Sequence, residues 1–150
     1  MMIKEVYTKN VVTARPDETL YHAAKAMWAR NVGAIVVVDR ENVPIGIITD
    51  RDISMKGVAQ GKDPKTTSLK SVMSQEVVAL NEERTLFEAA RTMSEQGIRR
   101  IPVVNERGTL SGIISLDDIL AVFGREMSAL AGTISYGTLS PAGKKLAAKG

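Results

Sequence analysis

Apolar positions in the first third of the chain predict a helix followed by two strands. Spacings of three and four, typical of one helix face, occur at Leu20, Ala23, Ala24, Met27 and Trp28. We expect Gly33 to end this helix. Residues 34–38 and 45–48 form apolar runs without polar alternation, which indicates strands covered on both faces. A short strand at 11–13 and a second helix that ends near Gly57 complete the order β-α-β-β-α.

The same order occurs a second time, 66 residues later. The segments 46–53 (GIITDRDI) and 112–119 (GIISLDDI) align, and the alignment extends without a gap back to Val6 and Val72. A duplicated structural unit explains this self-similarity better than coincidence. The second copy is therefore predicted to have strands at 77–78, 101–104 and 110–114, a helix at about 85–96, and a helix from Asp117 to Gly132.

These patterns predict a mixed α/β (α+β) fold made of two βαββα repeats. We expect repeat 1 at residues 5–60, a linker at 61–71, repeat 2 at 72–131 and a flexible basic tail at 132–150. With 150 residues and 44% hydrophobic content, the chain suits one domain with one core. A single repeat would leave one sheet face bare, so we expect the repeats to pair about a pseudo-twofold axis.

The composition excludes several classes of site. No cysteine is present, which rules out disulfides, thiolate metal sites and cysteine nucleophiles. The start lacks an apolar signal segment, and no run approaches the roughly 18 apolar residues of a membrane span, so we expect a cytoplasmic protein without membrane contact. The net charge of +3 comes from Lys144, Lys145 and Lys149, because no acidic residue follows Glu126. This distribution argues against nucleic-acid binding.

A hydroxyl and a carboxylate recur where a predicted strand meets a helix. They are Thr49 and Asp52 in the first copy, and Ser115 and Asp118 in the second. One interpretation is a capping box, in which these groups satisfy free N–H groups at the helix start. The other is a binding site, because a carboxylate can accept hydrogen bonds from a ribose cis-diol and helix amides suit phosphate. The same residues can serve both purposes.

The order and spacing of these motifs resemble the cystathionine β-synthase (CBS) domain, and their duplication over residues 5–124 resembles a CBS pair, or Bateman module. The resemblance rests on Val-Val, Thr-Leu, Ala-Ala, Met, Ile-Pro-Val-Val and Gly-Ile-Ile-Ser-x-x-Asp-Ile, in that order. It implies that AMP, ADP, ATP or S-adenosylmethionine binds between the repeats. Asp52 and Asp118 would hold ribose hydroxyls, beside Thr49 and Ser115. The adenine would lie near Val11, Val12, Ile35, Val77, Val78, Ile101 and Pro102.

The two prospective sites differ in positive charge. By the same resemblance, Arg99 and Arg100 stand where ligand-binding members often place basic residues for phosphate, whereas the first copy has Gly33-Ala34 there. A guanidinium–phosphate contact is worth roughly 1.5 to 3 kcal/mol, so the Asp118 site is expected to favour a phosphorylated ligand. The alternative is a pair of surface arginines. Arg51 is predicted either to reach a phosphate or to form an ion pair with a neighbouring aspartate.

The expected function is regulatory and not catalytic. The sequence shows no nucleophile paired with a base, no metal-ligand cluster and no P-loop, so we predict no enzyme activity, no metal and no cofactor beyond a regulatory adenosyl ligand. The resemblance also suggests a flat homodimer built from the helices of two pairs, and signalling to a protein partner. The alternatives are a ligand-free scaffold, in which the motifs act only as helix caps, and a nucleic-acid or metal-binding regulator. His22 is expected on the surface, and Trp28 in packing or a dimer contact.

Overall fold

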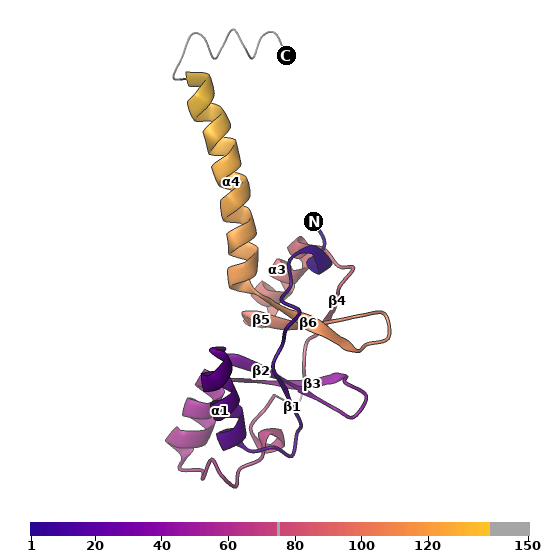
Figure 1. Cartoon of the computed structure of the whole chain (residues 1–150), viewed down its shortest axis with the longest axis vertical. Helices are drawn as coiled ribbons and strands as arrows, with labels where there is room; N and C mark the ends of the chain where they lie inside the picture. The colour runs from indigo at the N-terminus through magenta and orange to yellow at the C-terminus, as the bar shows by residue number, and fades with distance from the viewer. Residues whose placement is uncertain (75, 139–150) are drawn as a thin grey trace.

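The fold consists of two similar halves, each with a three-stranded sheet and its own helices (Figure 1). The computed structural model describes residues 1–74 and 76–138. The first half contains β1 (Thr13–Ala14), α1 (Leu20–Arg30), β2 (Ala34–Val38), β3 (Pro44–Thr49) and α2 (Asp50–Asp52). The second half contains β4 (Leu80–Asn81), α3 (Leu86–Gln96), β5 (Arg100–Val104), β6 (Leu110–Ser115) and α4 (Leu116–Thr138). The predicted mixed fold with a repeated βαββα order is confirmed.

Both sheets pair their strands in the same way. The middle strand β2 runs parallel to β1 and antiparallel to β3, and β5 has the same relation to β4 and β6. Val36 pairs with Ile47, and Pro102 pairs with Ile113. A register shift interrupts β2 after Val37 and β5 at the equivalent place. The second sheet therefore repeats the first, irregularity included.

Several element ends differ from the predicted ones. The outer strands begin later than expected, at Thr13 and Leu80, where pairing with β2 and β5 begins. Helix α1 ends at Arg30 and not at Gly33, because Asn31 adopts the left-handed conformation (φ 52°) and caps the helix. After α2, the chain forms a π-helical turn at Ile53–Gly57 and a 3-10 turn at Val58–Gln60 in place of one regular helix.

The prediction of a single core was wrong, because the buried apolar side chains form two clusters. The segment that precedes the first half completes the cluster of the second half, and the segment that precedes the second half completes the cluster of the first half. Ile3, which is fully buried, packs with Leu86 and Ile101 of the second half, and its N–H donates to the carbonyl of Arg84 at 2.7 Å. Leu69 is likewise fully buried in the first cluster. Part of the predicted 61–71 linker therefore belongs to the first half.

The connecting segments also cross the two sheets closely at Gly46 in β3 and Gly112 in β6. A methyl group on Gly112 would collide with the Tyr7 ring and the Thr8 carbonyl. Thr8 exchanges two backbone hydrogen bonds with Ile113, at 2.9 and 3.0 Å. At Gly46 the neighbour is the side chain of Met73. The close backbone approach at Gly112 brings residues 7–8 of the chain to the second sheet.

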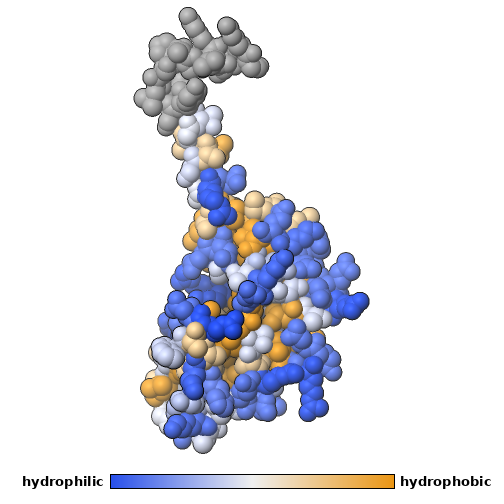
Figure 2. Space-filling model, in the orientation of Figure 1, coloured by the Kyte–Doolittle hydropathy of each residue, from blue (hydrophilic) through white to orange (hydrophobic). Residues whose placement is uncertain are grey.

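Helix α4 extends well beyond the body of the protein (Figure 1). It passes through Gly124 and Gly132, so the prediction that Gly132 ends it was wrong. A glycine inside a helix costs only about 1 kcal/mol relative to alanine, and strong helix formers flank it at 129–131. The predicted tail at 132–150 therefore begins inside a helix, and residues 139–150 lie outside the described part. Figure 2 shows apolar residues along the projecting part of α4.

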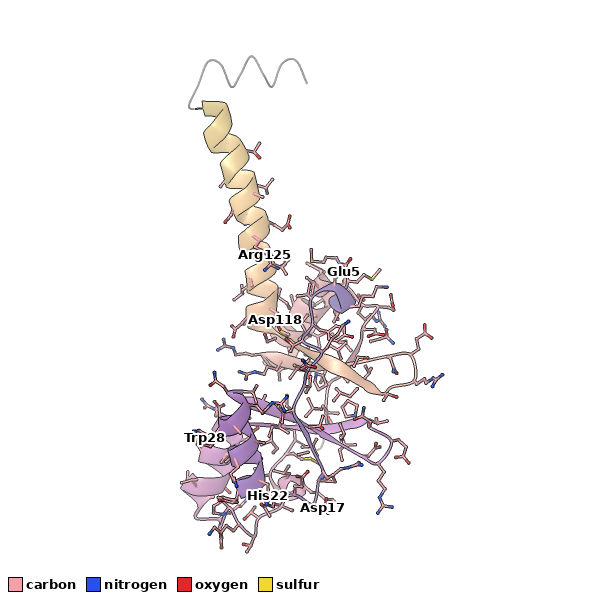
Figure 3. The ribbon with its side chains drawn as sticks, viewed as in Figure 1. Glu5, Asp17, His22, Trp28, Asp118 and Arg125 are labelled. Atoms are coloured by element: carbon pink, nitrogen blue, oxygen red, sulfur yellow. The ribbon has the colours of Figure 1, made fainter. Side chains whose placement is uncertain are left out.

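Two side chains of α1 face outward. Trp28 is 83% exposed, so it does not pack inside the fold, and the alternative of a dimer contact stays a prediction. His22 is exposed as expected, and Figure 3 labels both residues on α1 in the lower half of the molecule. Among the described helices, none has the length and apolar character needed to cross a membrane.

Candidate functional site

Two pockets lie between the halves, one at each Ser/Thr-x-x-Asp motif. The pocket at the start of α4, here the Asp118 pocket, has a volume of about 220 Å³, and the pocket at the start of α2, here the Asp52 pocket, has about 340 Å³. Figure 3 shows Asp118 at the base of α4. The first pocket is lined by Thr8, Asn10, Val11, Val12, Val32, Gly33, Ala34, Arg100, Ile113, Ser115 and Asp118. The second is lined by Ile47, Thr49, Asp50, Arg51, Asp52, Ser74, Gly97, Ile98, Arg99 and Arg100.

The two pockets are copies of one arrangement, related by the 66-residue offset. Each takes its hydroxyl and carboxylate from one half and the residues just before the middle strand from the other half. The Asp118 pocket thus combines Ser115 of β6 with Val32 and Ala34 of the first half. The matched pairs are Thr8 and Ser74, Val32 and Ile98, Gly33 and Arg99, Ala34 and Arg100, Ile113 and Ile47, Ser115 and Thr49, and Asp118 and Asp52.

Both motifs form capping boxes. In the second half, the backbone N–H and the hydroxyl of Ser115 donate to Oδ2 of Asp118 at 2.8 and 2.7 Å, and the Asp118 N–H donates to Ser115 Oγ at 3.1 Å. Thr49 and Asp52 repeat this pattern at 3.0, 3.0 and 3.1 Å. The capping interpretation is therefore confirmed, and the same aspartates also line the pockets. The cap holds each carboxylate in one orientation.

The second carboxylate oxygen distinguishes the two motifs. Within the described residues, Oδ1 of Asp118 takes part in no hydrogen bond or ion pair. Oδ1 of Asp52 instead lies 3.2 Å from Nζ of Lys56, one turn later. The position equivalent to Lys56 in the second half is Val122, which is buried in the core. Asp118 therefore keeps an acceptor that Asp52 shares with a lysine.

The arginines are distributed differently from the prediction. Arg100 lines both pockets, whereas Arg99 lines only the Asp52 pocket, because each pocket takes residues from both halves. Nη2 of Arg99 lies 3.5 Å from Oδ1 of Asp117, and both side chains are mostly exposed. Arg51 lines the Asp52 pocket, and its guanidinium forms no ion pair with a described residue. The expectation that both arginines serve the Asp118 pocket was wrong for Arg99.

The predicted apolar contacts are only partly brought together. Val11 and Val12 line the Asp118 pocket, but their counterparts Val77 and Val78 are half-buried and do not line the Asp52 pocket. The strand residues predicted near the base are fully buried and line neither pocket. These residues are Ile35, Ile101 and Pro102.

Sequence reasoning missed the apolar residues that share a strand face with the hydroxyls. Ile113 stands two residues before Ser115, and Ile47 stands two residues before Thr49. Because side chains alternate along a strand, each isoleucine lies on the same face as the hydroxyl and lines the same pocket. The period of two along β3 and β6 was the signal that could have identified them.

Among the described residues, no group of three or more histidine, cysteine, aspartate or glutamate side chains is placed to hold a metal ion. The pockets instead offer a fixed carboxylate, a hydroxyl, arginine side chains and an apolar wall. This set suits a ligand with a hydroxylated sugar, a flat apolar base and a polar or charged extension.

Known proteins are similar to this chain in sequence and in fold. The model of the family described as "CBS domain" matches residues 3–57 and 69–125. A protein of Methanopyrus kandleri is 40% identical over 120 residues, covering 80% of this chain and 61% of that protein, so the match spans less than two thirds of that relative.

Two crystal structures resemble the fold over most of its length. One is a CBS domain pair in complex with 5′-methylthioadenosine and S-adenosyl-L-methionine, with a TM-score of 0.77 and 28% identity, covering 84% of this chain and 98% of the other. The second is a hexameric CBS-CP12 protein from bloom-forming cyanobacteria, with a TM-score of 0.73 and 31% identity, covering 99% and 93%. The chain therefore belongs to the CBS domain family, and its two halves form a CBS domain pair.

Proposed function

We propose that this protein is a non-catalytic regulatory module of the cytoplasm. It binds adenosine-containing ligands in its two pockets and signals the bound state to a protein partner. The adenosyl ligands of the similar CBS domain pair, 5′-methylthioadenosine and S-adenosyl-L-methionine, support this class of ligand.

The observation that carries the proposal is the Asp118 carboxylate. Its Oδ2 is held by Ser115 while Oδ1 takes no partner among the described residues. A fixed carboxylate with an available oxygen can accept hydrogen bonds from ribose hydroxyls without rearranging the helix start. Hydrogen bonds to a charged group contribute roughly 1.5 to 3 kcal/mol each. The apolar side chains of Val11 and Val12 on the same pocket provide a surface for the base.

The two pockets favour different ligands within this class. The Asp52 pocket carries Arg51, Arg99 and Arg100 and has Lys56 beside its carboxylate, so it suits the phosphates of AMP, ADP or ATP. The Asp118 pocket carries one arginine, which it shares. It suits an adenosyl ligand without a polyphosphate, such as S-adenosylmethionine. This assignment reverses the preference expected from the sequence.

Titration of the full chain with AMP, ADP, ATP, S-adenosylmethionine and 5′-methylthioadenosine tests the proposal. We expect at least one of them to bind, and a ligand present at 100 times its dissociation constant adds about 2.7 kcal/mol to the stability of the folded state. Calorimetry gives the affinity and the number of sites, and thermal unfolding gives the stabilisation.

The second candidate is a ligand-free interaction scaffold. The observation in its favour is the complete capping box in both halves, which gives both aspartates a structural role. A scaffold predicts neither heat of binding nor a shift in the melting temperature with any adenosyl compound.

Signalling requires ligand binding and partner binding to be coupled. A coupling free energy of about 1 to 3 kcal/mol is sufficient. Residues of both halves line each pocket, so a ligand that contacts them all can shift one half against the other. Hydrogen exchange with and without ligand measures this: we expect slower exchange at β3, β6 and the starts of α2 and α4. Unchanged exchange under saturation would contradict the coupling.

A further inference from the structure

One arginine belongs to both pockets. Among the described residues, Arg100 is the only one that lines the Asp52 pocket as well as the Asp118 pocket. Gly33 lines the Asp118 pocket, and Asp50 lines the Asp52 pocket. A methyl group on Gly33 would lie 3.6 Å from Nη2 of Arg100 and 3.2 Å from Oδ2 of Asp50. The guanidinium of Arg100 therefore lies where the two pockets meet.

The duplicated sequence explains why this side chain reaches both pockets. At the 66-residue offset, Arg100 matches Ala34 and Arg99 matches Gly33. The first half thus has a methyl group and a hydrogen atom where the second half has two long side chains. This difference leaves room for the side chain of Arg100 at the boundary. As a result, the two pockets have one cation in common and not one each.

The guanidinium of Arg100 is available to an anion. The residue is half-buried, and its side chain forms no ion pair with a described residue. Arg99, by contrast, is exposed, and its Nη2 lies 3.5 Å from Oδ1 of Asp117. A guanidinium has five N–H donors, and a partly buried charge is screened less by water and salt than an exposed one. A phosphate in either pocket can therefore bind Arg100.

The two pockets depend on Arg100 to different degrees. The Asp52 pocket has two further arginines, Arg51 and Arg99. The described lining of the Asp118 pocket contains no other arginine and no lysine, and its only carboxylate is that of Asp118. Once a phosphate in the Asp52 pocket binds the guanidinium, the Asp118 pocket keeps a negative charge and has no available cation. It then disfavours a phosphate and accepts an adenosyl ligand without net negative charge.

We propose that the two pockets compete for Arg100, so that an anionic ligand in one pocket lowers the affinity of the other pocket for a second anion. A nucleotide in the Asp52 pocket thereby selects a ligand without phosphate for the Asp118 pocket. The effect is reciprocal, because the coupling free energy between two binding sites is the same in both directions. This inference rests on the proposed function, since it requires adenosyl ligands in both pockets, and it adds a dependence of one pocket on the other.

A comparison of equilibrium constants tests the competition. Calorimetry with AMP is carried out on the full chain and on its Asp52→Asn and Asp118→Asn variants, each of which weakens one pocket and keeps the other. For independent pockets, the wild-type constant for filling both equals the product of the constants of the two kept pockets. We expect it to be smaller by about tenfold or more, the size of one charge-assisted contact. With 5′-methylthioadenosine, which has no phosphate, the two values should agree.

Substitution of the arginines identifies the group that couples the pockets. Arg100→Gln, introduced into all three proteins, should largely abolish the difference measured with AMP. Arg99→Gln is the matched control, because this neighbouring arginine lines only the Asp52 pocket, and it should leave the difference in place. An undiminished difference with Arg100→Gln would assign the coupling to repulsion between the phosphates and would overturn the proposal. The comparison of AMP with 5′-methylthioadenosine needs no substitution at Arg100.

The outcomes separate this inference from the proposed function. Independent filling of both pockets by AMP, or binding of AMP to only one of the two single-pocket variants, would refute the competition and leave the proposed function standing. Absence of binding by both compounds in the wild-type chain would refute the proposed function and the competition together.

Discussion

Replacing Asp118 with asparagine separates a ligand-binding carboxylate from a helix cap. In the structure, Oδ2 accepts hydrogen bonds from the N–H and hydroxyl of Ser115, whereas Oδ1 accepts none from the described residues. Asparagine keeps one carbonyl oxygen that can accept the Ser115 hydrogen bonds, and it replaces the other oxygen with an NH₂ donor. The cap is therefore retained, and the second acceptor is lost.

The two effects differ in size. Without ligand, the Asp118→Asn variant loses one negative charge from the first turn of α4, which costs about 0.3 to 1 kcal/mol. A ribose loses one or two charge-assisted hydrogen bonds, each worth roughly 1.5 to 3 kcal/mol. Because 1.4 kcal/mol corresponds to about tenfold in affinity, the dissociation constant should rise at least tenfold.

The assay combines urea unfolding of the ligand-free protein with calorimetric titration of the ligand that binds the wild type. Asp117→Asn is the matched control, since Asp117 lies in the same first turn, is 75% exposed and does not line the pocket. It should lose similar stability and keep its affinity. If Asp118→Asn binds the ligand with unchanged affinity, Asp118 is a cap only, and the reasoning is wrong.

Three further predictions concern other parts of the molecule. Arg100→Gln should weaken ligand binding in both pockets by about tenfold or more, because Arg100 lines both, whereas Arg99→Gln should affect only the Asp52 pocket. Two-site calorimetry with ATP and S-adenosylmethionine measures the affinity of each pocket. A loss of affinity in only one pocket of the Arg100→Gln variant would contradict this prediction. Gly112→Ala should lower the free energy of unfolding in urea by about 1 to 3 kcal/mol, because the added methyl group meets the Tyr7 ring and the Thr8 backbone. Gly46→Ala should lower it less, because its methyl group meets the flexible side chain of Met73. Equal losses in the two variants would contradict the close backbone approach at Gly112. The pKa of Glu88 lies below its ordinary value of 4.5, mainly because its carboxylate accepts a hydrogen bond from the Thr85 backbone N–H and, second, because of the Arg84 side chain. The contribution of the ionised Glu88 carboxylate to stability is therefore present above pH 4.5 and is lost as the pH falls through the folded pKa. Glu88→Gln should therefore flatten the acid limb of the stability curve measured by denaturant unfolding, and an unchanged limb would disprove this role.

The element order was predictable because it depends on local patterns. The apolar runs of β2 and β5 and the stripes of α1 and α3 are local signals, and the caps at Thr19 and Thr85 define the helix starts. Because the unit is duplicated, each of these patterns occurs twice in the sequence, and each copy supports the interpretation of the other. These features need no knowledge of how distant segments pack.

The exchange of segments between the halves was not predictable in this way. Ile3 and Leu69 lie outside the predicted strands and helices. Only the folded chain brings Ile3 into the core of the second half and Leu69 into the core of the first half. The pairing of the two halves likewise places Arg99 at the Asp52 pocket. Local spacing contains no information on such long-range contacts.

The end of α4 was mispredicted for a different reason. Gly132 looks like a helix stop, and glycine often ends helices. Here the helix continues to Thr138 because the neighbouring residues favour it more than one glycine disfavours it. The apolar stripe of α4, which continues past Gly132 to Ile134, was the better guide.

The most direct test of the central claim is a calorimetric titration of the wild-type chain and of the double variant Asp52→Asn/Asp118→Asn with the five adenosyl compounds. The account predicts saturable binding of at least one compound to the wild type, with affinity at least tenfold lower in the double variant. Absence of binding by all five compounds, or equal affinity in the two proteins, would contradict it.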